Sequence, residues 1–287
     1  MAAGHGRGGR TAAFLAAGFC AALPASAPAG LAAEAVDLEL VIATDSSRSI
    51  DLAEAELQRE GVAAAFASPE VIQAVEAGYL GRIAVAYIDF SSRVQNKVVV
   101  DWRVIGDRES ATDFATALLE AELNFGMSTS ISDAIELAAR MIEANDIEGT
   151  RRVIDVSGDG PNNFGRLVDR VRDETVAREI AINGLPIMNP RDRYNTRYYL
   201  ADLDRYFEGC VIGGPGAFVV IAEDFDDFAR AIRRKLILEI AGRAPPATPR
   251  RAAIAPAQLG QSGGSTYEKG CDIGERMRGS SWGVYEP

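Results

Sequence analysis

The chain has 287 residues, of which 47% are hydrophobic and 25% are charged, a balance typical of globular proteins. The formal net charge of -11 argues against a nucleic-acid backbone or an anionic membrane surface as the main partner. The single histidine, His5, lies in a segment that we expect to be removed. A mature chain without imidazole has no Ser-His-Asp or Cys-His catalysis and no histidine-ligated zinc, so oxygens or thiolates must hold any metal.

Residues 1–35 are typical of a secretory signal peptide. Arg7 and Arg10 provide the positive start, an apolar stretch covers residues 12–23, and the small-x-small sequence Ala33-Glu34-Ala35 suits cleavage. The apolar stretch is too short to span a membrane, and no later stretch is long and apolar enough. We therefore expect an exported protein, periplasmic or secreted, without a membrane span.

The cysteines allow two interpretations. Removal of the signal peptide takes away Cys20 and leaves Cys210 and Cys271. Export permits a disulfide between these two residues. Alternatively, Cys210 is a buried thiol and Cys271 is a thiol in the tail. Neither belongs to a CxxC motif, so we do not expect a thiolate metal site.

After the signal peptide, apolar runs that suit strands alternate with patterns that suit helices. The predicted strands are residues 36–44, 83–90, 97–105, 152–157, 180–187 and 217–222. The predicted helices begin near Asp51, where Glu54 is a capping-box partner, and continue at residues 111–121, 131–143, 165–178 and 225–240.

This alternation predicts a three-layer α/β fold, Rossmann-like and doubly wound, around a mostly parallel six-stranded sheet. The strands are nearly continuous apolar runs, as expected when helices cover both faces. Residues 97–105 alternate in polarity and follow a short connection, which predicts one antiparallel edge strand. We expect one domain over residues 36–242. Residues 243–287, rich first in Pro and then in Gly and Ser, are predicted to form a flexible tail.

Five oxygen-bearing side chains follow predicted strands or precede a predicted helix. Asp45, Ser47 and Ser49 come directly after the first strand, Thr129 precedes a helix, and Asp159 follows the fourth strand. In a doubly wound sheet of order 3-2-1-4-5, the first and fourth strands are neighbours, and ligands bind at their carboxyl ends. We therefore expect these five side chains to lie around one site.

A ring of carboxylate and hydroxyl oxygens suits Mg²⁺, which requires oxygen ligands in octahedral geometry. Asp45 and Asp159 together only neutralise the ion, and hydroxyls add no charge, so the ion stays electrophilic. A carboxylate from a protein partner fits the open position. Mn²⁺ or Ca²⁺ is a possible substitute for Mg²⁺.

The arrangement resembles the von Willebrand factor A (VWA) domain and its metal-ion-dependent adhesion site, or MIDAS. The family pattern is D-x-S-x-S, then a Thr in T-x-x-x-x-A-[IL], then an Asp after the fourth strand. Asp45, Ser47 and Ser49 match the first part, Thr129 opens the sequence TSISDAI, and Asp159 matches the last. The resemblance implies that the hydroxyls bind the ion directly, that the aspartates often act through water, and that a partner supplies the last ligand.

The resemblance covers about residues 36–242. The runs RRVIDVSGDGPNN and INGLPI are similar to a secreted bacterial subfamily of VWA-like proteins with no assigned function. One departure is Arg48, where many adhesive members carry Gly. This cation either pairs with an acidic ligand or narrows access to the site.

Other interpretations of these residues stay open. D-x-S-x-S also suits a plain strand-to-helix turn, with Ser49 or Asp51 as the helix cap. An Mg²⁺-dependent hydrolase or phosphatase would use Asp45 as its nucleophile, but Ser47 stands where haloacid-dehalogenase-type phosphatases carry a second Asp, so the general acid is missing. A VWA scaffold that works without metal is the third alternative. We expect a binding module and not an enzyme.

Two further features have ordinary explanations. Asn162 and Asn163 follow Asp159-Gly160-Pro161, where they either contact a ligand or only form a turn. The basic run Arg233-Arg234-Lys235 lies late in the last predicted helix, where cations complement the helix dipole. We expect that run to lie on a solvated face.

Overall fold

The computed structural model describes Met1, Gly4 and residues 33–190, 198–243 and 267–279. Most of the predicted signal peptide lies outside these residues, so the prediction is untested. Among the described residues, no helix is both long and apolar enough to cross a membrane. The fold described below belongs to the unit Ala33–Pro287.

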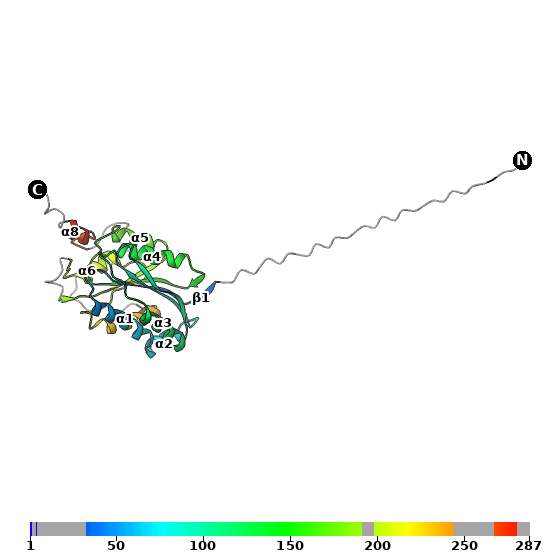
Figure 1. Cartoon of the computed structure of the whole chain (residues 1–287), viewed down its shortest axis with the longest axis horizontal. Coiled ribbons are helices and arrows are strands. Elements are labelled where there is room, and N and C mark those ends of the chain that lie inside the picture. The colour runs from blue at the N-terminus through cyan, green and yellow to red at the C-terminus, as the bar shows by residue number, and fades with distance from the viewer. Residues whose placement is uncertain (2–3, 5–32, 191–197, 244–266, 280–287) are drawn as a thin grey trace. The chain divides into compact units, whose positions relative to one another are not determined.

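A five-stranded sheet of order β4-β3-β2-β6-β7 forms the middle layer (Figure 1). All neighbours are parallel except β3 and β4, which are antiparallel, as predicted for the edge. Two short strands, β1 and β5, pair separately. The bounds are β1 Glu34–Val36, β2 Leu38–Asp45, β3 Ile83–Phe90, β4 Lys97–Ile105, β5 Ile147–Gly149, β6 Arg152–Gly158 and β7 Ala181–Pro186.

The segment predicted as a sixth strand, residues 217–222, runs parallel to β7 but makes only isolated bridges with it. The amides of Val220 and Ala222 donate to β7 carbonyls. The amide of Phe218 donates instead to the side-chain Oδ1 of Asn183, at 2.9 Å. Because a side chain takes the place of a backbone acceptor there, the ladder is interrupted and the segment does not form a full strand.

Helices cover both faces of the sheet and complete the predicted three layers (Figure 1). On one face lie α1 Leu52–Phe66, α2 Pro69–Glu76, α3 Arg108–Glu120 and α7 Phe228–Ile240. On the other lie α4 Ile131–Glu143, α5 Val168–Val176, α6 Leu203–Tyr206, the π-helical turn η2 Phe207–Val211 and α8 Ile273–Gly279. Alternate residues of β2 enter the two cores, Leu40 and Ile42 on one side and Val41 and Ala43 on the other.

The start of α1 follows the predicted capping box. The Asp51 side chain accepts from the amide of Glu54 at 2.9 Å, and the Glu54 side chain accepts from the amide of Asp51 at 3.0 Å. These reciprocal bonds satisfy amides that the first helical turn leaves open. The chain therefore turns directly from the loop after β2 into α1.

The prediction of a flexible tail is wrong for residues 267–279. These residues carry α8, and Cys271 forms a disulfide with Cys210 of η2, which settles the question that the sequence left open. Cys271 and Tyr267 are also part of the core beneath α4 and α5. Residues 244–266 and 280–287 lie outside the described residues.

The expectation of a solvated face is wrong for Lys235. Its side chain is fully buried, and its ammonium lies 2.5 Å from both Asp155 of β6 and Glu239 of α7. Asn183 of β7 donates to the same Glu239 oxygen at 2.9 Å. One cation therefore joins α7 to the middle of the sheet.

Candidate metal centre

The two strands that carry the predicted aspartates lie side by side. β2 and β6 pair in parallel up to Thr44 and Ser157, so Asp45 and Asp159 leave the sheet at the same carboxyl edge. Gly158 permits their close approach, since a Cβ at this position would lie 3.1 Å from Oδ2 of Asp45. The topology thus places both carboxylates at the carboxyl edge of the sheet, where the strand order predicted a site.

A continuous set of hydrogen bonds joins the five predicted side chains. Ser47 Oγ lies 3.1 Å from Ser49 Oγ, and Thr129 Oγ1 donates to Ser47 Oγ at 3.1 Å. Ser49 Oγ donates to Asp159 Oδ1 at 2.9 Å, and the Ser47 amide donates to Asp45 Oδ1 at 2.7 Å. Residues separated by more than a hundred positions therefore meet in one polar cluster. Metal binding by that cluster stays a prediction.

Asp45 is the most deeply buried member of the cluster. It is 1% exposed, and its Oδ2 is buried and accepts no hydrogen bond from any described residue. Burial raises the pKa of Asp45 to about 7, although hydrogen bonds from Ser47 oppose this rise. A bound cation would satisfy this buried carboxylate oxygen, so the residues present fit a metal ion.

The donor chemistry is that of a hard oxygen site. Within the described parts of the chain, no group of three or more His, Cys, Asp or Glu residues is placed to hold a metal. Any ion at this cluster would therefore depend on the hydroxyls of Ser47, Ser49 and Thr129 in addition to the two carboxylates. Hydroxyl and carboxylate ligands suit Mg²⁺, Mn²⁺ or Ca²⁺.

Asn163 braces the Thr129 loop, a role that the sequence left open between ligand contact and turn. Its Oδ1 accepts from the Thr129 amide at 3.0 Å, and its amide donates to the Thr129 carbonyl at 2.9 Å. Neighbouring Asn162 accepts from the Ser132 amide at 3.0 Å. The asparagine pair thus connects the loop after β6 to the start of α4. The position of the pair in the loop that begins at Asp159, three and four residues later, was the signal in the sequence.

Ser91, which the sequence analysis did not single out, holds the same loop from the side of β3. Its Oγ donates to the Ser128 carbonyl at 2.6 Å, and its carbonyl accepts from the Ser130 amide at 2.6 Å. A Cβ on Gly126 would come within 1.9 Å of Ser91 Oγ, so a side chain there would displace the brace. Thr129 is therefore fixed from two neighbouring loops.

Exposed apolar side chains stand on the loops that carry the site. Met127, two residues before Thr129, is 65% exposed, and Phe125 and Phe164 are exposed as well. Arg48, within the D-x-S-x-S motif, is also exposed. The polar cluster is thus accompanied by apolar and cationic side chains that are partly exposed to solvent.

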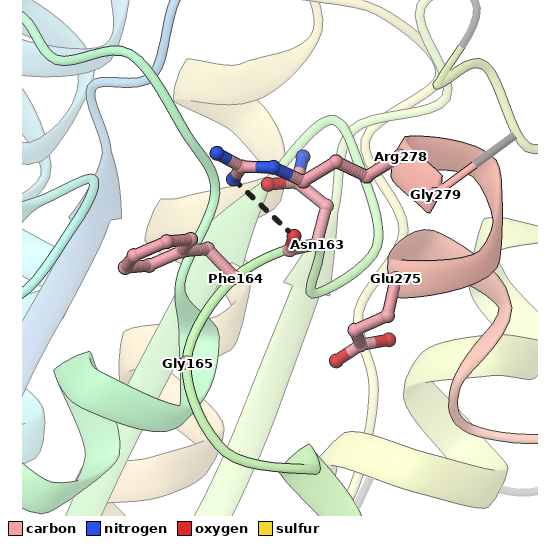
Figure 2. Close-up of a pocket in the computed structure, with 6 residues that line it drawn as sticks. All are labelled: Asn163, Phe164, Gly165, Glu275, Arg278 and Gly279. Carbon is pink, nitrogen blue, oxygen red and sulfur yellow. Dashed lines mark hydrogen bonds between the residues drawn. The ribbon is translucent and has the colours of Figure 1, made fainter. Parts of the chain in front are cut away.

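Beside the cluster lies a pocket of about 480 Å³ between the loop after β6 and α8 (Figure 2). Arg278 of α8 extends over the ring of Phe164, with 4.7 Å between the guanidinium carbon and the ring centroid. The same guanidinium donates to Ser128 Oγ at 3.0 Å and to the Asn163 carbonyl at 3.5 Å. The pocket and the polar cluster therefore share the loops around Thr129 and Asn163.

Solved structures with a similar fold include proteins of the VWA type. The pilus adhesin SpaC from Lactobacillus rhamnosus GG has a TM-score of 0.53 at 15% identity, over 72% of this chain and 30% of the adhesin. Proximal thread matrix protein 1 from the mussel byssus, with a zinc-occupied MIDAS motif, has a TM-score of 0.50 at 12% identity, over 71% of this chain and 46% of that protein. A von Willebrand factor type A protein from Catenulispora acidiphila has a TM-score of 0.49 at 14% identity, over 72% and 43%.

This chain spans less than half the length of each of these three proteins, and the low identities limit the likeness to the fold. The likeness to SpaC and to the mussel protein supports the fold that the motifs predicted. No curated protein matches the sequence. A family model does match, over residues 35–244, and the chain therefore belongs to the family described as "Protein of unknown function (DUF1194)".

Proposed function

We propose that this protein is an exported, metal-dependent binding module that captures an acidic group of a protein partner. Asp45, Ser47, Ser49, Thr129 and Asp159 would hold the ion, and Mg²⁺ is the ion that this donor set suits best. The observation that carries the proposal is the buried Asp45 Oδ2, which lacks a hydrogen-bond donor in the described structure and lies within a cluster of hydroxyls and a second carboxylate.

The carboxylates and the hydroxyls of the proposed site have different roles. Asp45 and Asp159 supply two negative charges, and the hydrogen-bonded hydroxyls keep their oxygens directed into the cluster. When bound, a divalent ion supplies an electrophilic position that a carboxylate can occupy. The zinc-occupied MIDAS motif of the mussel protein supports a divalent ion at this place in the fold.

The surface near the cluster supports a protein as the ligand. Met127, Phe125 and Phe164 present apolar area to solvent, and such area is the usual centre of a protein interface. Exposed Arg48 adds a positive charge that favours an acidic partner. The similar fold in SpaC, described as a pilus adhesin, agrees with an adhesive role.

Titration of the metal-free protein with Mg²⁺ by calorimetry tests the metal site. Wild type is expected to bind one ion, and Asp45→Ala and Asp159→Ala are expected to give no binding heat, because each removes half of the charge that holds the ion. Asp113→Ala is the matched control, since Asp113 is an exposed aspartate on α3. A flat trace for wild type with Mg²⁺, Mn²⁺ and Ca²⁺ would instead support a scaffold that works without metal.

Capture of exported proteins on immobilised wild type tests the partner. Proteins that are retained in Mg²⁺ and released by EDTA, and that Asp45→Ala does not retain, would support the proposal. Retention that is unchanged in EDTA would refute the metal-dependent mechanism. Turnover of a phosphatase substrate that requires Mg²⁺ and is lost in Asp45→Asn would favour an enzyme.

Met127→Ser separates partner binding from metal binding. Removing an exposed apolar side chain from the surface is expected to weaken partner binding by about tenfold. The Mg²⁺ affinity should not change, because the Met127 side chain points to solvent and is not one of the proposed ligands. Calorimetry with Mg²⁺ and a binding measurement with the captured partner provide the two values. Equal partner affinity in the variant and in wild type would show that Met127 does not contribute to the interface.

A further inference from the structure

The short helix α8 lies outside the region that the family model matches, yet it packs against the loops of the metal cluster. The disulfide between Cys271 and Cys210 holds the residues before α8 against η2. Tyr206 adds a second link, since its hydroxyl accepts from the Asn162 amide at 3.1 Å and donates to the Cys271 carbonyl at 3.4 Å. The helix is therefore anchored at its start and directed at the loop after β6.

Three residues of α8 contact the loop after β6. Gly274 lies so close that an added Cβ would come within 2.0 Å of the Asn162 carbonyl oxygen. Glu275 accepts from Asn162 Nδ2 at 2.6 Å. Arg278 donates to Ser128 and to the Asn163 carbonyl, as Figure 2 shows for the latter. The absence of a side chain at Gly274 is what allows the helix backbone to reach the loop.

The residues that α8 contacts are those that brace the cluster. Asn163 exchanges two hydrogen bonds with the backbone of Thr129, and Asn162 accepts from the Ser132 amide in the first turn of α4. Ser128, which accepts from Arg278, directly precedes Thr129. Contacts therefore run without interruption from the disulfide through α8 and the asparagine pair to Thr129, and the same loop begins at Asp159.

We propose that α8 is a disulfide-anchored positioning element of the metal centre, which holds Thr129 and Asp159 in place through Asn162, Asn163 and Ser128. The proposal rests on the proposed function, because it assumes that the cluster binds an ion. In a domain that ends with α7, no such helix would contact these loops. In this chain, the proposal makes metal affinity depend on the C-terminal segment that carries α8. Partners that orient metal ligands commonly change metal affinity about 10–100-fold.

Two glycines of α8 provide a matched test. Gly274→Ala forces the helix away from the Asn162 carbonyl, whereas Gly279→Ala makes the same chemical change in the same helix and meets no atom of the described residues within 4 Å. Mg²⁺ titration is expected to show binding that is weaker by at least about tenfold for Gly274→Ala, and wild-type affinity for Gly279→Ala. Hydrogen exchange of the metal-free protein should show faster exchange at the Asn163 amide in Gly274→Ala only.

A second pair of variants checks the hydrogen bond. Glu275→Gln keeps an oxygen that can accept from Asn162 and should retain wild-type Mg²⁺ affinity, whereas Glu275→Ala should weaken binding. The double variant Cys210→Ser, Cys271→Ser should weaken it as well, because the helix loses its anchor. If wild type binds Mg²⁺ and Gly274→Ala binds it equally well, α8 has no positioning role. If wild type itself binds no ion, the proposed function fails, and this inference fails with it.

Discussion

Replacing Lys235 with Met is expected to destabilise the protein by about 3–5 kcal/mol, the usual effect of removing one partner from a buried ion pair. The ammonium lies 2.5 Å from both Asp155 and Glu239, and all three side chains are almost fully buried. Burial and the charge of Glu239 already raise the pKa of Asp155 to about 7, and Lys235 opposes this rise. Without the lysine, the two carboxylates lose the ammonium that pairs with both of them in the core.

Chemical denaturation at pH 8 measures this effect, because Asp155 is then mostly ionised in wild type. Arg234→Met is the matched control, since Arg234 precedes Lys235 in α7 but is exposed, and its loss should change stability by less than about 0.5 kcal/mol. Adding Asp155→Asn to Lys235→Met should recover part of the loss. Equal stability of Lys235→Met and Arg234→Met would show that the buried charges do not hold α7 on the sheet.

Much of the fold follows from local patterns. β3 and β4 begin and end at the predicted residues because each is an apolar or alternating run between polar turns, and α4 does so because Ser130 caps it. The meeting of Asp45 and Asp159 was also predictable, because strand order alone makes β2 and β6 neighbours. Local patterns of polarity and helix capping, together with one rule of strand order, were sufficient to predict these features.

The features that the sequence did not reveal depend on contacts between distant residues. The polar segment of α8 has no strong pattern of its own, and it takes its place through the bond from Cys271 to Cys210. Lys235 stands in a basic run that is typical of a surface, and its burial depends on the carboxylate of Asp155 in the distant strand β6 as well as on that of Glu239. The brace from Asn163 to Thr129 depends on how two loops meet. Such pairings are set by the folded structure and leave little trace in local sequence.

Asp45→Asn is expected to stabilise the metal-free protein at pH 8 and to abolish metal binding. The pKa of Asp45 is raised by burial from its ordinary value of 3.8 to about 7 in the folded state. Between these two pH values, the folded protein therefore holds a proton that the unfolded chain has released. The favourable contribution of this group is complete below the unfolded pKa and is lost as the pH rises through 7. The loss between pH 5 and pH 8 amounts to about 3 kcal/mol, at roughly 1.4 kcal/mol per pKa unit.

Thermal unfolding of wild type and Asp45→Asn in EDTA, between pH 5 and pH 8, measures this loss as a difference. The pKa of Asp89 is raised to about 6 and that of Asp155 to about 7, mainly by burial, so both destabilise the folded state over the same range. Because wild type and Asp45→Asn both contain Asp89 and Asp155, the effects of these two groups cancel in the stability difference between the two proteins. The advantage of Asp45→Asn should therefore grow with pH in EDTA. Saturating Mg²⁺ should offset most of this advantage, since ligand at a hundredfold excess over Kd adds about 2.7 kcal/mol to wild type alone. A stability advantage of Asp45→Asn that does not change with pH, or that Mg²⁺ does not reduce, would mean that the buried Asp45 carboxylate does not bind a cation.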